Sequence, residues 1–204
     1  MNDYKPSAAD VKQLRDRTQA GMMDCRNALV ETGGDVDAAV KLLREKGIAS
    51  AGKRAGRGTG EGLVATYVHG GGRIGAMVEI GCETDFVARN DQFQAFARKV
   101  AMQIASSRDL RFTSEAEITD DFRTSELAIY RTKAASEGRP AAMLDKIADG
   151  MFQKSLADTV ILNQPSIHPE DDGKTIETLR AELSGTLGEN IEVKRFARFE
   201  VGGE

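Results

Sequence analysis

The stretch LVATYVHGGGRIGAMVEIGC, residues 63–82, decides the fold of this chain. Apolar residues recur along it with a period of two, which is typical of strands with one buried face. One strand is predicted over 63–69 and a second over 73–81, and the glycines at 70–72 between them predict a hairpin turn. Four residues of the second strand are expected to share its inward face: Ile74, Ala76, Val78 and Ile80.

The last segment, NIEVKRFARFEVG at 190–202, alternates again and predicts a third strand. Its apolar side, interrupted by Arg195, is expected to consist of Ile191, Val193, Ala197, Phe199 and Val201. This segment is distant in sequence from the hairpin, but a strand needs a sheet to join. A small, largely antiparallel sheet is therefore expected.

The first 50 residues predict three short helices. Ser7 can cap the first helix, the second ends at Gly33 and Gly34, and Asp35 can cap the third. A bundle of this size is marginal on its own, because its core is small.

The fold class expected for the whole chain is α+β, with a small antiparallel sheet packed by helices. An amphipathic helix is predicted over 93–104, two or three helices between 115 and 160, and another over 175–187. A glycine-rich segment separates the first helices from the strands. The expected division is an N-terminal three-helix domain at 1–50, a linker at 51–62, and an α+β core and dimerisation region at 63–204.

The composition is that of a globular protein, with 40% hydrophobic and 29% charged residues. A net charge of −4, the absence of tryptophan and an aromatic content of 5% argue against direct nucleic-acid binding. Cys25 and Cys82 have no metal-ligand spacing and are expected to be free and buried. No apolar run reaches membrane-spanning length and no signal pattern opens the chain, so a cytoplasmic protein without a membrane partner is expected.

Two glycine-rich stretches could suggest catalysis, but neither fits a known motif. GRGTGEG at 56–62 lacks the pattern and the lysine of a phosphate-binding loop, and HGGG at 69–72 has no accompanying nucleophile elbow. His168 lies in a polar loop and is expected to be solvated rather than a general base. We therefore expect no catalytic site, no metal and no cofactor.

CETDFVARND, residues 82–91, follows the second strand and contains an aromatic residue in polar company. Thr84 has the character of a helix cap, and Phe86 stands beside Val87 between Asp85 and Arg89. A core position under the sheet and an exposed contact position are both open for this phenylalanine.

Two signatures resemble those of the bacterial elongation factor Ts family, the nucleotide exchange factors of the GTPase elongation factor Tu. LRDRTQAGMMDCRNAL at 14–29 resembles the first and departs from it at Gln19 and Arg26. EIGCETDFVARN at 79–90 resembles the second and departs from it at Gly81. The closing stretch at 189–203 is similar to the end of short family members.

The resemblance implies that this chain binds elongation factor Tu in its GDP-bound form and promotes GDP release during translation elongation. Phe86 would wedge between helices of the GTPase and disturb its Mg²⁺ and phosphate binding, with Asp85 as a polar neighbour and Thr84 and Val87 shaping the turn. An exchange factor of this kind catalyses no chemical reaction. The first signature implies a second contact, made by residues of the N-terminal domain: Leu14, Arg15, Thr18, Met22, Met23 and Arg26.

The length resembles that of the short form of the family, which implies a homodimer that binds two GTPases. The alternating segment at 191–201 could supply a sheet edge that needs a partner. The N-terminal helices alone are also similar to a ubiquitin-associated domain, so the alternative hypothesis is a ubiquitin-binding adaptor. The stretch CETDFVARN separates the two hypotheses, because an adaptor has no reason to carry it.

Overall fold

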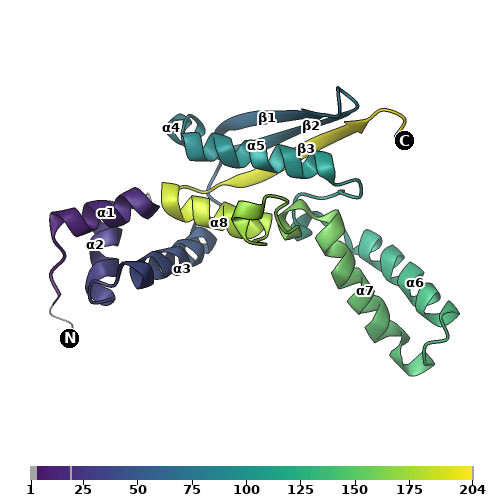
Figure 1. The fold of residues 1–204 in the computed structure, drawn as a ribbon. Helices are drawn as coiled ribbons and strands as arrows, with labels where there is room; N and C mark the ends of the chain where they lie inside the picture. The colour runs from purple at the N-terminus through teal and green to yellow at the C-terminus, as the bar shows by residue number, and fades with distance from the viewer. Residues whose placement is uncertain (1–3, 19, 204) are drawn as a thin grey trace. The chain divides into compact units, whose positions relative to one another are not determined.

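The computed structural model describes residues 4–18 and 20–203 (Figure 1). Its helices and strands follow one another as α1 (Ala8–Thr18), α2 (Met22–Glu31), α3 (Val36–Arg54), β1 (Glu61–His69), β2 (Ile74–Cys82), α4 (Asp85–Ala88), α5 (Asp91–Ser106), α6 (Asp120–Ser136), α7 (Leu144–Thr159), α8 (Ile176–Leu187) and β3 (Glu192–Glu200). Four single turns of 3₁₀ helix lie at Glu115–Glu117, Ala141–Met143, Ile161–Asn163 and Pro169–Asp171. The α+β class predicted from the sequence is therefore confirmed.

The chain forms two compact units. Unit 1 comprises residues 1–65, 79–97 and 178–193, and unit 2 comprises 66–78, 98–177 and 194–204. The three strands and α5 run through both units, and the sheet has the order β1-β2-β3 with antiparallel neighbours. Because β2 is central, β1 and β3 are both edge strands.

The core of the sheet is formed as the alternation predicts. Ala76, Val78 and Ile80 are buried on β2, and the residues between them point to the opposite face. Helix α5 lies along the sheet (Figure 1), and its buried residues recur at helical spacing: Phe93, Phe96, Ala97, Val100, Ala101 and Ile104. A helix with one apolar stripe on a sheet with one apolar face buries both surfaces together.

Strand β3 does not keep the single apolar face predicted for it. Val193 is buried, but Phe199 is 73% exposed and Val201 is exposed as well. The inward position near the end of the strand is taken by Arg198, which donates from Nε to the Ala105 carbonyl at 3.2 Å and from Nη2 to Glu200 at 2.8 Å. The side of β3 that faces α5 near the end of the strand is therefore the side of Arg198, and Phe199 faces away from α5.

The N-terminal helices form a small bundle in unit 1. The Ser7 hydroxyl accepts a hydrogen bond from the Asp10 amide, and Asp35 Oδ1 accepts from the amides of Asp37 and Ala38, so both predicted caps are present. Gly33 and Gly34 end α2 with positive φ values of 66° and 90°. The buried core of the bundle consists of Val11, Leu14, Cys25, Ala28, Leu29 and Ala39.

Helix α3 continues four residues into the segment expected as a linker, and β1 starts at Glu61. Residues 55–60 between them are nonetheless fastened to the rest of unit 1. The Arg57 carbonyl accepts from Asn190 Nδ2 at 2.9 Å, and the buried Thr59 donates from Oγ1 to Glu192 Oε2 at 2.7 Å. The division into 1–50, 51–62 and 63–204 stays a prediction.

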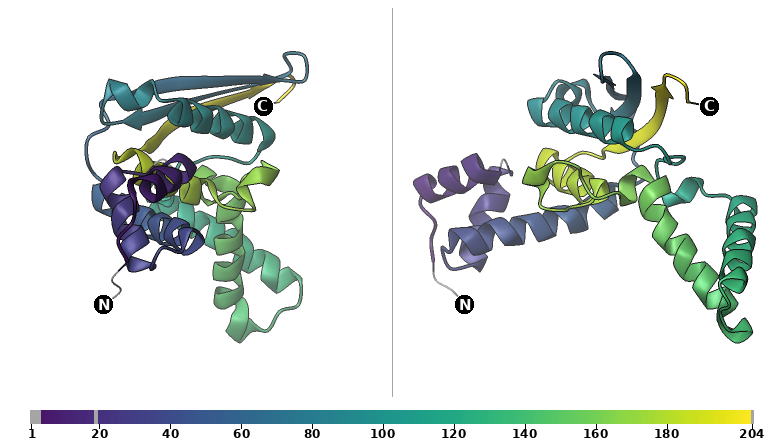
Figure 2. Two further views of the ribbon diagram at one scale, coloured as in Figure 1. Left: turned by 60° about the vertical axis from the view of Figure 1, so that its left-hand side comes forward. Right: turned by 45° about the vertical axis from the view of Figure 1, so that its right-hand side comes forward.

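In unit 2, α6 and α7 form a helical hairpin, which both views of Figure 2 show side by side. Its apolar cluster is built on Phe152, Leu156 and Val160, with Phe112 and Phe122 packed against it. The Phe112 and Phe122 rings meet edge to face, with their centroids 5.0 Å apart. The break predicted near residues 137–140 separates the two helices.

His168 is not the solvated side chain that its polar loop predicts. Only 15% of the side chain is exposed, and Nε2 is buried with no hydrogen-bond partner. Its backbone amide donates to Ser166 Oγ, and Ser166 in turn donates to Asp171 at 2.6 Å. The loop folds inward because Lys99 on α5 pairs with Asp171 at 2.7 Å, and the paired ammonium lowers the pKa of that carboxyl although burial raises it.

Candidate functional site

Phe86 projects into solvent. Its side chain is 80% exposed, although phenylalanine is usually buried in folded proteins. It lies on α4, a single helical turn of four residues between β2 and α5, of which no residue is buried. Phe86 is therefore not a core residue under the sheet.

The neighbours of Phe86 share its turn. Asp85 pairs with Arg89 one turn later, at 2.9 Å between Oδ2 and Nη2. With these side chains 45% and 78% exposed, the pair stabilises the turn by only a few tenths of a kcal/mol. Val87 is half-buried, and Thr84 occupies the N-cap position. The four predicted residues 84–87 thus lie together on one short turn.

Thr84 does not cap α4 with its side chain, because its hydroxyl bonds elsewhere. Thr84 Oγ1 donates to Oε1 of Glu189 at 2.6 Å. The other carboxylate oxygen, Oε2, accepts from the amides of Glu83 and Thr84 at 3.0 Å each. One carboxylate therefore holds three donors of the segment that leads into the Phe86 turn.

A second carboxylate, that of Glu83, holds the backbone beside Glu189 in return. Glu83 Oε1 accepts from the Asn190 amide at 2.6 Å and pairs with Arg57 Nη1 at 3.5 Å. Asn190 also holds the Arg57 carbonyl, as described above. We call the set Arg57, Glu83, Thr84, Glu189 and Asn190 the loop clasp. It ties together three segments that lie far apart in the sequence.

Cys82 lies beneath the loop clasp and is fully buried. Its thiol donates to the Thr84 carbonyl at 3.2 Å. Burial, together with the negative charge of Glu189, raises the pKa of this thiol to about 11. It is therefore a neutral hydrogen-bond donor rather than a reactive thiolate.

The residues of the first signature lie on α1 and α2 and differ in exposure. Arg15, Met22, Met23 and Arg26 are exposed, with the methionine side chains at 53% and 61%. Thr18 is half-buried, and its hydroxyl donates to the Leu14 carbonyl. Leu14 itself is fully buried in the bundle, so it can support a contact surface only from beneath. Gln19, where the sequence departs from the first signature, lies outside the described residues.

The structure does not merge the two predicted groups into one site. Among the hydrogen bonds and ion pairs of residues 4–18 and 20–203, none joins the group on α1 and α2 to residues 84–87. Each group has its own support, which is the bundle core for the first and the loop clasp for the second.

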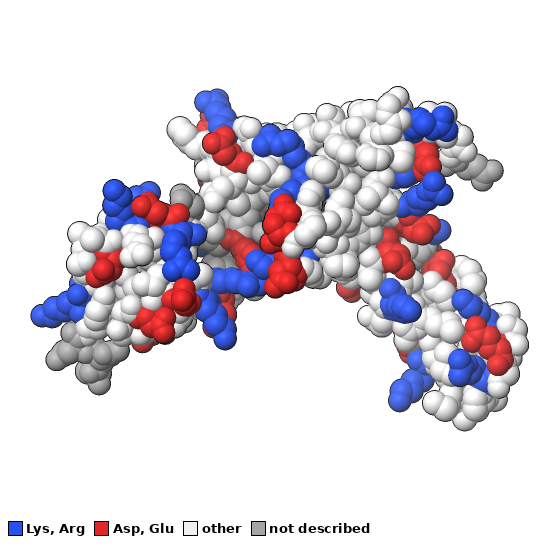
Figure 3. All heavy atoms as spheres, in the orientation of Figure 1, with Lys and Arg blue, Asp and Glu red and all other residues white. Residues whose placement is uncertain are grey.

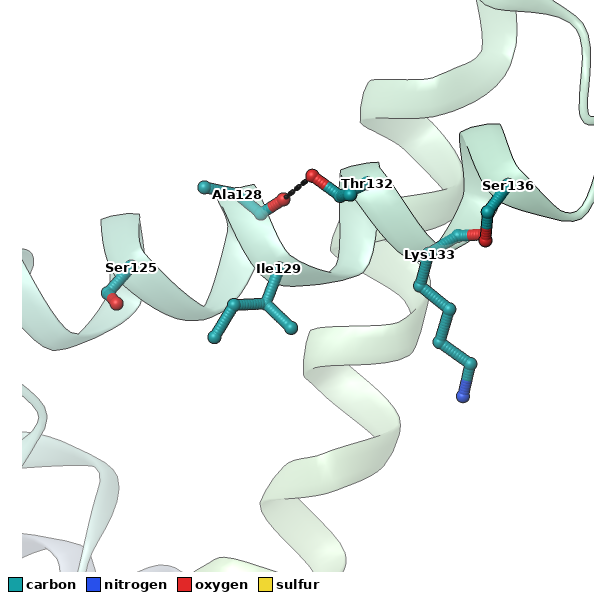
Figure 4. A pocket seen from close by; sticks show the side chains of 6 residues that line it. All are labelled: Ser125, Ala128, Ile129, Thr132, Lys133 and Ser136. Carbon is teal, nitrogen blue, oxygen red and sulfur yellow. Dashed lines mark hydrogen bonds between the residues drawn. The ribbon is translucent and has the colours of Figure 1, made fainter.

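Three cavities are lined by residues of unit 2, and Phe86 lines none of these three. A shallow groove of about 580 Å³ runs along α6, where Lys133 is the single charged group and Ile129 the large apolar one (Figure 4). A cavity of about 470 Å³ in unit 2 is lined by Tyr67, His69, Met102 and Arg198 among others. No group of three or more potential metal ligands occurs in the part of the chain that the structure describes. Ser106 and His69 both line the second cavity, but the Ser106 hydroxyl donates to the Gln103 carbonyl and His69 Nδ1 bonds to the Tyr67 hydroxyl, so these bonds do not join the two side chains.

Sequence reasoning missed the loop clasp. Glu83 stands inside the quoted CETDF stretch and Glu189 directly before the third strand, so both were visible as residues. The contact between Glu189 and the backbone of Glu83 could not be predicted, because the two residues lie 106 positions apart and no local pattern links them. Glutamate in a turn is ordinarily solvated, so neither carboxylate was expected to accept hydrogen bonds from the backbone.

Comparison with known proteins identifies the family of this chain. A family profile described as Elongation factor TS matches residues 36–203. The chain is 47% identical over 196 residues to Elongation factor Ts of Caldanaerobacter subterraneus subsp. tengcongensis, and the match covers 96% of both proteins. It is 49% identical over 196 residues to Elongation factor Ts of Solidesulfovibrio magneticus, again covering 96% of both. Against Elongation factor Ts of Thermosynechococcus vestitus it is 48% identical over 96% of this chain and 65% of that protein. The chain belongs to the elongation factor Ts family, the nucleotide exchange factors of elongation factor Tu.

Proposed function

We propose that this chain releases GDP from elongation factor Tu by inserting Phe86 into the GTPase, which disturbs its Mg²⁺ and phosphate contacts. The observation that carries the proposal is the 80% exposure of Phe86 on a turn whose backbone is fastened from below. An exposed aromatic ring on a fixed backbone can enter a pocket with little loss of conformational entropy.

The energy that Phe86 alone can supply is smaller than the energy that exchange requires. A phenylalanine buries roughly 150–250 Å² in a pocket, which corresponds to roughly 4–6 kcal/mol of apolar transfer before association costs are subtracted. A thousandfold weakening of nucleotide binding needs about 4 kcal/mol of coupling, and nucleotide then weakens the factor's binding by the same ratio. After those costs the ring alone falls short, so further contacts are required.

We propose that the exposed residues of α1 and α2 supply these contacts. Met22 and Met23 offer adaptable apolar surface, and Arg15 and Arg26 offer charge. Thr18 and Leu14 act from beneath by fixing the end of α1. These contacts bind the GTPase in both nucleotide states, whereas the Phe86 contact favours the nucleotide-free state.

We further propose a homodimer formed through the open face of the sheet. Val68, Met77, Phe199 and Val201, all in unit 2, are exposed, and the first three lie on the face turned away from α5. An apolar sheet face beside an edge strand is a liability in an isolated monomer.

Direct contact with nucleic acid or membrane forms no part of this proposal. Charges of both signs are interspersed on the face of the molecule in Figure 3. Such a surface supports the expectation from the net charge of −4. Within the described residues, each helix is too short or too polar to cross a lipid bilayer.

The test is release of a fluorescent GDP analogue from elongation factor Tu by the wild-type protein and by Phe86→Ala. We expect the variant to lower the release rate at saturating factor by at least roughly tenfold, about 1.4 kcal/mol. Ile129→Ala is a suitable control, because it removes a similarly exposed apolar side chain on α6. If a folded Phe86→Ala protein releases GDP as fast as wild type, the wedge is wrong and other contacts carry exchange.

A further inference from the structure

We propose that Glu189 is a positioning residue for nucleotide exchange, because its carboxylate fixes the backbone that presents Phe86. The inference rests on the proposed role of Phe86. Neither of the two signatures includes this residue, which opens the closing stretch 189–203, three positions before β3 and 103 positions after Phe86.

The geometry at Glu189 is that of a clamp rather than of a surface charge. Oε2 accepts from two consecutive amides, those of Glu83 and Thr84, at 3.0 Å each, and Oε1 accepts from Thr84 Oγ1 at 2.6 Å. Hydrogen bonds to an ionised acceptor are stronger than those between neutral groups. Three such bonds from one side chain fix both the position and the orientation of the segment.

The Phe86 turn depends on this clamp because it has little other support. A helix of four residues cannot hold itself, since one turn forms at a net cost in free energy. No residue of α4 is buried, and its N-cap residue makes no side-chain bond to the turn. The turn is therefore held by the segment before it, through the loop clasp and the Cys82 thiol bond, and by Gln94 of α5, whose Nε2 donates to the Arg89 carbonyl at 3.5 Å.

The return contact strengthens the argument. Glu83 accepts from the Asn190 amide at 2.6 Å, so each of the two segments holds the backbone of the other. The Glu83 side chain also pairs with Arg57, but that distance is 3.5 Å and Arg57 is half exposed. Glu189 accepts three hydrogen bonds of 3.0 Å or less, whereas Glu83 accepts one such bond, at 2.6 Å, which distinguishes Glu189 within the loop clasp.

Loss of the clamp would spread the turn over several conformations. If only a fraction of the molecules presents Phe86 in the productive position, the saturating rate of GDP release falls in proportion to that fraction. The contacts of α1 and α2 are unaffected by this loss, so initial binding of the GTPase persists. A positioning role therefore predicts a fall in the saturating release rate with a small change in the half-saturating concentration.

The experiment compares Glu189→Ala with Glu189→Gln in the GDP-release assay on elongation factor Tu. Alanine removes all three bonds, whereas glutamine keeps an oxygen for the two amides and an amide group that can donate to the Thr84 hydroxyl. We expect Glu189→Ala to lower the saturating rate roughly tenfold, about 1.4 kcal/mol, with less than about a threefold change in half-saturating concentration. Glu189→Gln should restore most of the rate.

The double variant Phe86→Ala with Glu189→Ala tests whether Glu189 acts through Phe86. If Glu189 acts through Phe86, the double variant is no slower than Phe86→Ala alone. A folded Glu189→Ala protein with the wild-type rate overturns the positioning role while leaving the wedge intact. If Phe86→Ala itself has the wild-type rate, the wedge fails, and a slow Glu189→Ala protein then acts by another route, which also overturns the inference.

A measurement on the wild-type protein covers the case in which Glu189→Ala does not fold. Amide hydrogen exchange should be slowed at Glu83 and Thr84, because both amides donate to Glu189. If both exchange as fast as a free peptide, the clamp is absent in solution and the proposal is wrong.

Discussion

Cys82 is the residue at which the buried sheet meets the exposed Phe86 turn. Its neutral thiol donates to the Thr84 carbonyl and lies near the negative charge of Glu189. Both the burial and that charge disfavour the thiolate, which is why the pKa is raised from 9.0 to about 11. A thiol in this position is a structural group.

The raised pKa predicts a loss of stability in alkaline solution. The unfolded thiol ionises from about pH 9 and the folded thiol only from about pH 11, so its contribution is complete below pH 9 and is lost as the pH rises through 11. Each pH unit in this window removes up to about 1.4 kcal/mol. Urea unfolding of wild type and Cys82→Ala should therefore converge in stability between pH 9 and pH 11. Parallel stability curves would contradict the assignment.

Single residues of the site could be predicted only where a motif carried them. The CETDF stretch marked Phe86, but its exposure could not be derived, because aromatic residues are usually buried. The role of Glu189 depends on a fold that brings residues 83 and 189 together. Leu14 belongs to the first signature and is buried, so its proposed part in the contact is to support the exposed residues from beneath.

Among the elements, α3 and α8 are packed unusually closely in unit 1. A Cβ on Gly185 would lie 2.5 Å from the Gly47 Cα, whereas a Cβ on Gly47 would lie 3.5 Å from the Gly185 Cα. Arg54 near the end of α3 also donates to the Ser184 carbonyl at 3.4 Å. The contact is therefore asymmetric, although both residues are glycine.

This asymmetry predicts opposite results for the same substitution. Gly185→Ala must push the two helices apart and should destabilise the protein by about 1–2 kcal/mol, despite the better helix propensity of alanine. Gly47→Ala meets ordinary contact distances and should be neutral or stabilising by up to about 1 kcal/mol. Urea unfolding midpoints check both. Equal effects of the two substitutions would show that the helices do not approach this closely.

Elements governed by local rules could be predicted from the sequence. The glycine hairpin, the Ser7 and Asp35 caps and the apolar stripe of α5 all follow from neighbouring residues. Features that depend on contacts with a distant element could not be predicted from the local sequence. Helix α3 continues through Gly52, and Arg54 in its last turn contacts α8. Near the end of β3, Arg198 rather than Phe199 faces α5, because Arg198 donates to the Ala105 carbonyl there.

At the scale of the whole molecule, the fold class could be predicted because periodicity changes plainly from 3.6 to 2 after residue 60. The homodimer is predicted only by the family resemblance, because the strand pattern predicts an inward face and says nothing of the outer one. The exposed side chains of Val68, Met77 and Phe199 support the proposed dimer interface.

The proposed homodimer predicts a solution mass of twice 22.0 kDa, measured by light scattering after gel filtration. Phe199→Glu should shift the protein towards monomer, because it places a charge on the open sheet face. Ile129→Glu makes the same change at an exposed residue of α6 and should leave the mass unchanged. A wild-type protein that elutes as a monomer at micromolar concentration would refute the dimer.

The fastening of residues 55–60 has a consequence for how two separate contacts act on one partner. Arg57 and Thr59 are both held to the segment that begins β3, so only Ala55 and Gly56 separate α3 from the first of these ties. A span of two residues reaches at most about 7 Å, so the end of α3 can move only a short distance from the start of β3. With both proposed contacts engaged, the second forms at a high effective concentration set by this short tether. If both proposed contacts form, the factor binds its partner bivalently, and two individually weak contacts are then sufficient.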